Sequence, residues 1–185
     1  TDLPMGSMVL ITALGSGDTF PIGATTVTYE ERDNTNSPTG ETCSFNVIVE
    51  DNEEPALTGI AYSGATNINS CLANATTAAP FNASLAVSGY TDNCSGPITA
   101  TLTNTGTSGT DDSWTVTYTF TISDANRNDL TGQTYTNTGG DSTAPTLTGT
   151  AYTGTTGTNA CSADAATAAP FDATLATSGY TDNCG

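Results

Sequence analysis

The chain has 185 residues, enough for two small domains. It carries 19 acidic residues against two arginines, with no lysine and no histidine, and its formal net charge is −17. This balance excludes nucleic acid as a partner, because phosphate binding depends on Lys and Arg, and no apolar run approaches the roughly 20 residues of a membrane span.

Residues 1–54 carry the period-two pattern of apolar residues that is typical of β-strands. Three segments show it, at 7–14, 25–31 and 43–50. Clusters rich in Gly, Asn and Asp separate these segments and predict turns, at 15–18 and 33–40. Because the chain is also rich in Thr, which suits pleated strands, we predict an all-β fold.

The next segment, residues 55–144, begins an internal repeat. Residues 55–95 and 145–185 align without a gap at an offset of 90 residues, and both contain AAPF and SGYTDNC. Such a period is longer than the roughly 20–50 residues of a solenoid repeat and close to the roughly 100 of an immunoglobulin-like β-sandwich. Strand patterns recur here at 57–62, 98–104, 114–122 and 147–152, with a predicted turn at 104–112.

An Ala-rich part of each repeat, at 76–87 and 167–177, has an ambiguous pattern. Its composition allows a helical turn, but Pro80 in the first repeat and Pro170 in the second limit the length of any helix.

The repeat predicts one complete module and one split module. Residues 55–144 form the complete module, and residues 145–185 correspond to the first half of another. Residues 1–54 correspond to a second half, because the strand motif TVTY occurs in them and again in the complete module. We therefore expect tandem immunoglobulin-like β-sandwich modules, in which residues 145–185 of one copy and 1–54 of a neighbouring copy complete one module. Unpaired strand edges and open apolar faces favour such pairing.

A family resemblance rests on three motifs. FPIGATTVTY (20–29), CSFNVIVEDNEEP (43–55) and TDNC (91–94 and 181–184) resemble the hyalin repeat (HYR) modules of the immunoglobulin-like superfamily. Residues 96–144 depart from the pattern, because the position of the CSF strand reads QTYTNT and lacks the cysteine. The Thr-, Asn- and Gly-rich composition also resembles surface adhesins of gliding, Bacteroidota-like bacteria. The resemblance implies a β-sandwich on the cell surface.

The five cysteines predict disulfides and an oxidising, extracellular compartment, since the absence of histidine argues against zinc. Cys71 and Cys94 are 23 residues apart, as are Cys161 and Cys184, so the repeat predicts these two pairs and leaves Cys43 unpaired. The resemblance instead implies a bond from Cys184 to Cys43 of a neighbouring copy, because the DNC cysteine of HYR modules bridges to the CSF cysteine. Both alternatives stay open.

Acidic residues gather at the two predicted module junctions, before Pro55 and Pro145. Calcium takes six to eight oxygen ligands, so these residues are candidate calcium ligands. They are Asp51, Glu53, Glu54 and Asp141. The alternative is a solvated acidic linker, since the sequence holds no D-x-D-x-D loop.

Five residues lie in glycosylation patterns. Asn74, Asn82 and Asn93 fit N-x-[ST], and Ser142 and Thr143 follow an aspartate as in bacterial O-glycosylation. Three-residue patterns arise often by chance in a chain this rich in Thr and Ser.

The sequence predicts no enzyme and no certain cofactor, calcium being the one candidate. It offers no histidine or lysine for catalysis, and Glu30 and Glu31 are neighbours on a strand and so point to opposite faces.

The leading hypothesis is a structural repeat or subunit of an extracellular fibre or filamentous surface adhesin, a homopolymer whose partners are neighbouring copies. The alternative is a cell-surface adhesion module that binds a glycan or a protein through loops.

Overall fold

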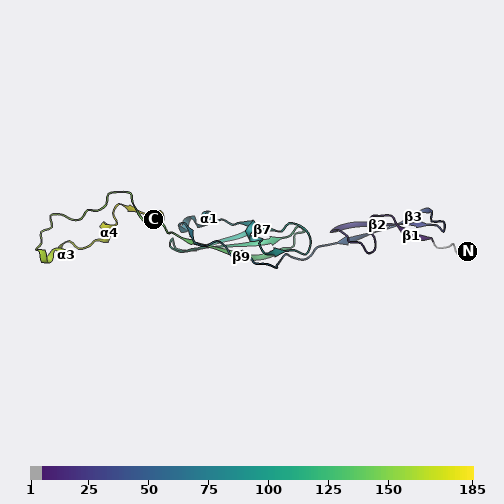
Figure 1. Ribbon diagram of the computed structural model, residues 1–185, viewed down its shortest axis with the longest axis horizontal. Coiled ribbons are helices and arrows are strands. Elements are labelled where there is room, and N and C mark those ends of the chain that lie inside the picture. The colour runs from purple at the N-terminus through teal and green to yellow at the C-terminus, as the bar shows by residue number, and fades with distance from the viewer. Residues whose placement is uncertain (1–5) are drawn as a thin grey trace.

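The computed structural model describes residues 6–185, so the first five residues of the predicted segment 1–54 lie outside it. The molecule is elongated, with an N-terminal sheet, a middle module and a C-terminal segment in a row (Figure 1). It consists mainly of strands in several sheets, with only short helices. The predicted all-β character is confirmed at this level.

The N-terminal sheet contains three antiparallel strands in the order β1 (Ser7–Leu10), β2 (Gly23–Arg32) and β3 (Pro38–Val49). β1 ends earlier than predicted, because the Thr12 hydroxyl donates to the Leu14 carbonyl and the chain bends there. β3 begins earlier than predicted, because its polar first half still pairs with β2.

The main sheet of the middle module has the order β5 (Ile68–Asn69), β9 (Asp129–Gly140), β8 (Trp114–Ser123) and β7 (Thr99–Gly109). On β8 every second side chain is buried, as expected for a strand with one face on the core. The buried residues are Trp114, Val116, Tyr118, Phe120 and Ile122. β8 is therefore the centre of the core.

The segment between β5 and β6 (Tyr90–Thr91) covers the buried face of this sheet. It forms three short helical turns, η1 (Leu72–Asn74), α1 (Ala75–Ala78) and α2 (Ala83–Ala86). The helical turns are as short as predicted, because Pro80 stands between α1 and α2. α1 contacts β8 and α2 contacts β7, and we call residues 55–95 the cover of the middle module.

Phe81 anchors the cover on the sheet. Its ring centroid lies 5.7 Å from that of Tyr118 and 5.7 Å from that of Tyr135. The Tyr118 hydroxyl also donates a hydrogen bond of 2.7 Å to the carbonyl of Ala79, and the Asn137 side-chain amide donates one of 3.0 Å to the same oxygen. Aromatic packing and buried hydrogen bonds together fix the cover in place.

The C-terminal segment repeats the elements of the cover in the same order, except that its residues, all described by the structure, form no counterpart of β5, which in the cover pairs with β9. Its elements are β10 (Thr146–Leu147), η2 (Ser162–Asp164), α3 (Ala165–Ala168), α4 (Ala173–Ala176) and β11 (Tyr180–Thr181). β10 pairs with β11 as β4 (Ala56–Leu57) pairs with β6. No sheet of the described chain packs on this segment, so Phe171, the repeat equivalent of Phe81, is 84% exposed.

Three predictions about the middle and C-terminal strands are wrong. The turn predicted at 104–112 is mostly strand, because β7 continues to Gly109 through backbone pairing with β8 although its sequence is polar. The sequence pattern also does not reveal β9, since Thr, Gly, Asn and Gln fill most of its positions. The strands predicted at 57–62 and 147–152 are strand at their first residue alone, as the ends of the two-residue strands β4 and β10. In both repeats two successive amides then bond to a single glycine carbonyl and the strand pairing ends.

Candidate functional site

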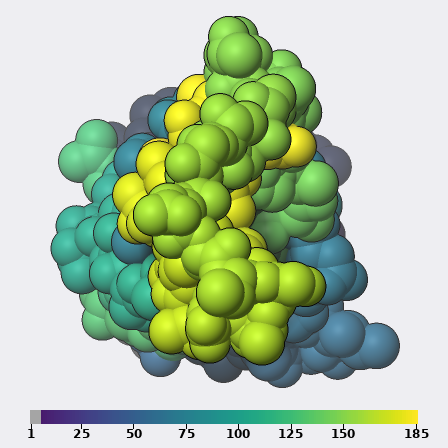
Figure 2. Space-filling model, turned by 90° about the vertical axis from the view of Figure 1, so that its left-hand side faces the viewer, coloured from purple at the N-terminus to yellow at the C-terminus, as the bar shows by residue number. Residues whose placement is uncertain are grey.

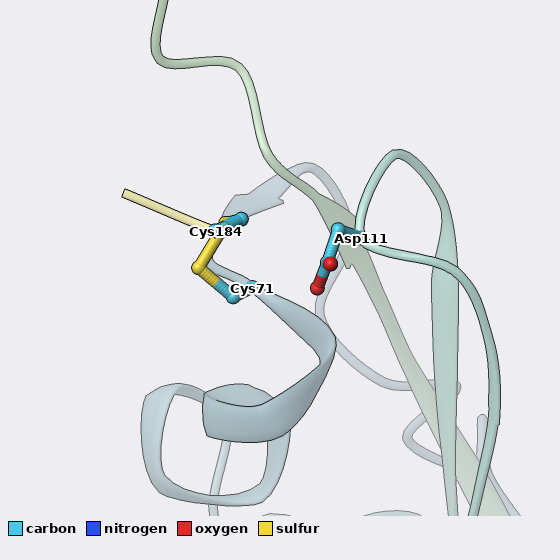
Figure 3. A group of neighbouring side chains, drawn as sticks. All are labelled: Cys71, Asp111 and Cys184. Carbon is cyan, nitrogen blue, oxygen red and sulfur yellow. A yellow bond between two sulfur atoms is a disulfide. The ribbon is translucent and has the colours of Figure 1, made fainter. Parts of the chain in front are cut away.

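A disulfide joins Cys71 to Cys184, 113 residues further along the chain (Figure 3). Their Cα atoms lie 5.3 Å apart, within the usual range for a disulfide. Cys71 directly precedes η1, and Cys184 lies in the TDNC turn after β11. The bond therefore links the middle module to the C-terminal segment instead of closing a loop within one repeat.

The predicted pairs Cys71–Cys94 and Cys161–Cys184 are both wrong. Within the described residues, Cys94, Cys161 and Cys43 are free thiols. The spacing misled because the two cysteines of a repeat lie at its opposite ends: Cys71 meets the following repeat, whereas Cys94 lies at the junction with the preceding segment, beside Asp51. The pairing implied by the family resemblance, Cys184 with Cys43 of a neighbouring copy, is also wrong here, because Cys184 is already bonded.

Hydrogen bonds to carboxylates hold the junction around Cys184. Asp182 accepts a hydrogen bond of 3.3 Å from the amide of Cys184. Asp141 accepts one of 2.9 Å from the amide of Thr143 and one of 3.2 Å from the side chain of Asn183. The Thr143 amide, helped by Asn183, outweighs the effect of burial and lowers the pKa of Asp141.

The junction around Cys94 has the same arrangement in the preceding repeat. Asp92 accepts a hydrogen bond of 3.0 Å from the amide of Cys94, and the Asn93 side chain donates to Glu53. Burial, and after it the carboxylates of Asp51, Asp92 and Glu53, raise the pKa of the Cys94 thiol. This thiol is therefore a weak nucleophile at neutral pH.

Two carboxylates meet at each junction, Asp51 with Asp92 and Asp141 with Asp182. One oxygen of Asp92 and the matching oxygen of Asp182 are buried without a hydrogen-bond partner in the described part of the chain. A buried carboxylate oxygen without a partner is costly, and a bound cation would satisfy it. Two of the predicted calcium ligands, Asp51 and Asp141, thus belong to carboxylate pairs.

The other two predicted ligands lie outside these pairs, because Glu53 bonds to Asn93 and Glu54 is exposed. A third acidic group, Asp111, lies beside the disulfide (Figure 3). Its carboxylate accepts a hydrogen bond of 2.8 Å from the amide of Leu72 and so fixes the start of η1. Both sulfurs next to it are in the disulfide and offer no thiolate to a metal.

The N-terminal sheet has an open apolar face. Val27 and Tyr29 occupy the positions in the TVTY motif that Val116 and Tyr118 occupy in β8. Phe45, opposite Val27 in the strand pairing, is 51% exposed, and its ring stacks on Tyr29 with the centroids 6.3 Å apart. These side chains line a hollow of about 250 Å³. We call this the open sheet face.

The C-terminal segment has the complementary open face. The residues that correspond to core-packing residues of the cover (Tyr62, Ala79, Phe81 and Ala86) line a hollow of about 370 Å³. They are Tyr152, Ala169, Phe171 and Ala176. Figure 2 views the molecule from this end, and the segment, in yellow-green and yellow, lies in front with nothing over it. We call this the open cover face. Val27 is already buried at 1% exposure, with Phe20 beside it in the same hollow, whereas Phe45 is open to solvent. The described chain thus holds a sheet whose apolar face is only partly covered, and a cover that lies on no sheet.

The predicted glycosylation residues all lie on the exposed surface: Asn74, Asn82, Asn93, Ser142 and Thr143. Two of the asparagines have structural roles, since Asn82 caps α2 and Asn93 bonds to Glu53. Sugar attachment remains a prediction.

Comparison with known proteins bears on the N-terminal sheet. Residues 4–49 match the HYR domain. This match confirms the predicted hyalin-repeat resemblance for the segment that contains β1, β2 and β3, and HYR domains are associated with cell adhesion. No curated protein and no solved structure matches the chain. Among the described residues, no helix has the length and apolar character needed to cross a membrane.

Proposed function

We propose that this chain is a structural repeat of an extracellular fibre or filamentous surface adhesin, assembled through immunoglobulin-like modules that neighbouring copies complete. The observation that carries the proposal is the pair of complementary open faces at the two ends of the molecule. The middle module supports it, because there the same kind of cover lies on the same kind of sheet.

Equivalent residues specify how two copies fit. In the middle module Phe81 packs on Tyr118. In the assembly Phe171 of one copy takes the place of Phe81, and Tyr29 of the next copy takes the place of Tyr118. Burying a large apolar side chain contributes about 1.5–3 kcal/mol, so a few such contacts favour association.

Several features support an extracellular location. Disulfides persist in oxidising compartments, and this chain has one. HYR domains occur in extracellular adhesion proteins, and residues 4–49 match that domain. The net charge of −17 keeps a long acidic fibre from associating non-specifically. A structural role of this kind requires no catalytic group.

The substitution Phe171→Asp tests the proposal. Phe171 is 84% exposed in a single copy, so the change leaves the fold of that copy intact. We expect filaments of the wild type in electron micrographs and monomers of Phe171→Asp in light scattering. The matched control is Ile60→Asp, because Ile60 is 90% exposed but lies outside both open faces, and we expect it to assemble normally. Filaments formed equally well by Phe171→Asp would contradict the proposal.

A second candidate function is adhesion to a glycan or a protein through loops, and one observation favours it. A hollow of about 430 Å³ beside the C-terminal junction is lined mainly by amide, hydroxyl and carboxylate groups, which suit sugar hydroxyls. The lining includes Asn67, Asn69, Asp112, Ser113, Thr138 and Asp141. A module that acts only in this way stays monomeric in the assembly experiment.

We also propose that calcium stiffens the junctions. The support is the pairing of carboxylates at both junctions and the buried oxygens of Asp92 and Asp182 that lack partners among the described residues.

A further inference from the structure

The two free thiols outside the HYR segment, Cys94 and Cys161, are repeat equivalents of the two bonded cysteines. The offset of 90 residues places Cys161 at the position of Cys71, and Cys94 at the position of Cys184. The observed disulfide therefore joins a Cys71-type residue of one module to a Cys184-type residue of the next.

The backbone around each free thiol already has the geometry of its bonded equivalent. Cys71 has φ −65° and ψ 152°, and Cys161 has φ −67° and ψ 153°. The amide of Cys184 donates to Asp182, as the amide of Cys94 donates to Asp92. Since the backbone at Cys161 and at Cys94 already has the conformation found at the bonded cysteines, a disulfide requires only that these two cysteines are brought together.

The proposed assembly brings them together. When residues 145–185 of one copy cover the N-terminal sheet of the next, the module that follows this composite is the middle module of the second copy. The Cys71-type residue of the composite is Cys161 of the first copy, and the Cys184-type residue of the following module is Cys94 of the second.

We propose that Cys161 of one copy and Cys94 of the next form an intermolecular disulfide that locks the fibre covalently. This inference rests on the proposed function. The bond forms by thiol–disulfide exchange: two thiols lose two protons and two electrons, and a small-molecule disulfide such as oxidised glutathione is reduced to two thiols.

A bond between Cys94 and Cys161 of the same copy does not fit the molecule. Cys94 lies at the junction with the N-terminal sheet, grouped with Asp51 and Asp92. Cys161 directly precedes η2 and α3, and α3 lies at the far end of the C-terminal segment, beyond the middle module (Figure 1).

Cys43 provides an internal control. Cys43 pairs with Tyr29 on β2, and Tyr29 corresponds to Tyr118 when the two TVTY motifs are aligned. Tyr118 in turn pairs with Tyr135 on β9. Cys43 therefore occupies the position of a buried core residue in a completed module, and no cysteine of the middle module occupies an equivalent partner position. We expect it to remain a thiol in the fibre.

The test uses the full chain in a glutathione redox buffer, analysed by non-reducing electrophoresis and by mass spectrometry of an unreduced digest. We expect a ladder of covalent multimers, a peptide pair linking Cys94 to Cys161, and the same ladder for C43S. C94S and C161S should each give no ladder. Mixed together, these two variants should give dimers alone, because only one Cys161 and one Cys94 remain to pair.

Electron microscopy of the same samples separates the two claims. Filaments without the Cys94–Cys161 peptide would overturn the disulfide and leave the proposed function standing. A ladder formed by Phe171→Asp as readily as by the wild type would show a collisional bond and overturn the inference. If neither filaments nor a ladder formed, both the proposed function and the disulfide would be overturned. If C94S filaments dissociated in detergent while wild-type filaments resisted it, both proposals would be supported.

Discussion

Asp33 and Asp124 occupy the same position in two hairpin turns, after β2 and after β8. Asp33 accepts hydrogen bonds from the amides of Thr35 and Ser37, and Asp124 from those of Asn126 and Asn128. The Thr35 hydroxyl and then these amides lower the pKa of Asp33. Burial of Asp124 acts to raise its pKa, but the hydrogen bonds from Asn128 and Asn126 outweigh it and the pKa is lowered.

We predict that Asp124→Asn removes a pH-dependent part of the stability. A carboxylate whose folded pKa is lowered stabilises the fold above its unfolded pKa of about 3.9, and this is lost as the pH falls through the folded pKa. The variant should melt at a lower temperature than the wild type at pH 7, and the difference should shrink below about pH 4. Melting curves across this range measure it.

Asp33→Asn should show the same trend with a smaller amplitude, because Asp33 is exposed whereas Asp124 is buried. The control is Glu41→Gln, an exposed carboxylate outside both turns. A constant difference between Asp124→Asn and the wild type from pH 7 to pH 2 would contradict the assignment.

At the scale of elements, the buried side-chain amide of Asn137 on β9 makes two hydrogen bonds to the cover, whereas the hydroxyl of Tyr118 on β8 makes one. The Asn137 side chain accepts from the amide of Ala65 at 2.8 Å and donates to the carbonyl of Ala79 at 3.0 Å. The Tyr118 hydroxyl donates only to that same carbonyl.

We predict that Asn137→Ala costs about 2–3 kcal/mol of unfolding free energy, because it leaves the Ala65 amide without a partner. Tyr118→Phe should cost about 1 kcal/mol, because Asn137 still bonds to the Ala79 carbonyl. Urea unfolding measures both, with the exposed Thr136→Ala expected within about 0.5 kcal/mol of the wild type. A smaller loss for Asn137→Ala than for Tyr118→Phe would contradict this account.

The elements that the sequence predicts well are those whose pattern is local. β8 alternates buried and half-buried residues along its whole length, and Pro80 limits α1 from within the segment itself. β9 and the outer half of β7 are held by pairing with β8 and carry few apolar residues, so local periodicity does not reveal them. The disulfide is also non-local: the repeat predicts which cysteines are equivalent, but only the stacking of modules shows which two meet.

At the scale of the molecule, the open faces and the junctions act together. In the proposed assembly, covering the open sheet face would join one copy to the next, and the junctions would set how rigidly successive modules follow each other. The junctions combine a high density of negative charge with carboxylate pairs, in a chain whose net charge is −17. In the proposed fibre, repulsion between these carboxylates would oppose a straight arrangement of modules unless a cation balanced it.

We predict that calcium raises the melting temperature of the chain and stiffens its filaments. A ligand that binds only the folded state stabilises that state more as the ligand concentration rises, so the melting temperature should rise steadily through the millimolar range typical of extracellular calcium modules.

Calorimetric titration with calcium should show two sites, one at each junction. Asp92→Asn and Asp182→Asn should each remove one site, whereas Glu54→Gln, at an exposed carboxylate outside both pairs, should remove neither. Excess chelator should lower the melting temperature of the wild type and increase the bending of filaments in micrographs. Unchanged melting and bending in chelator, with no heat of calcium binding, would leave the carboxylate pairs as solvated linkers.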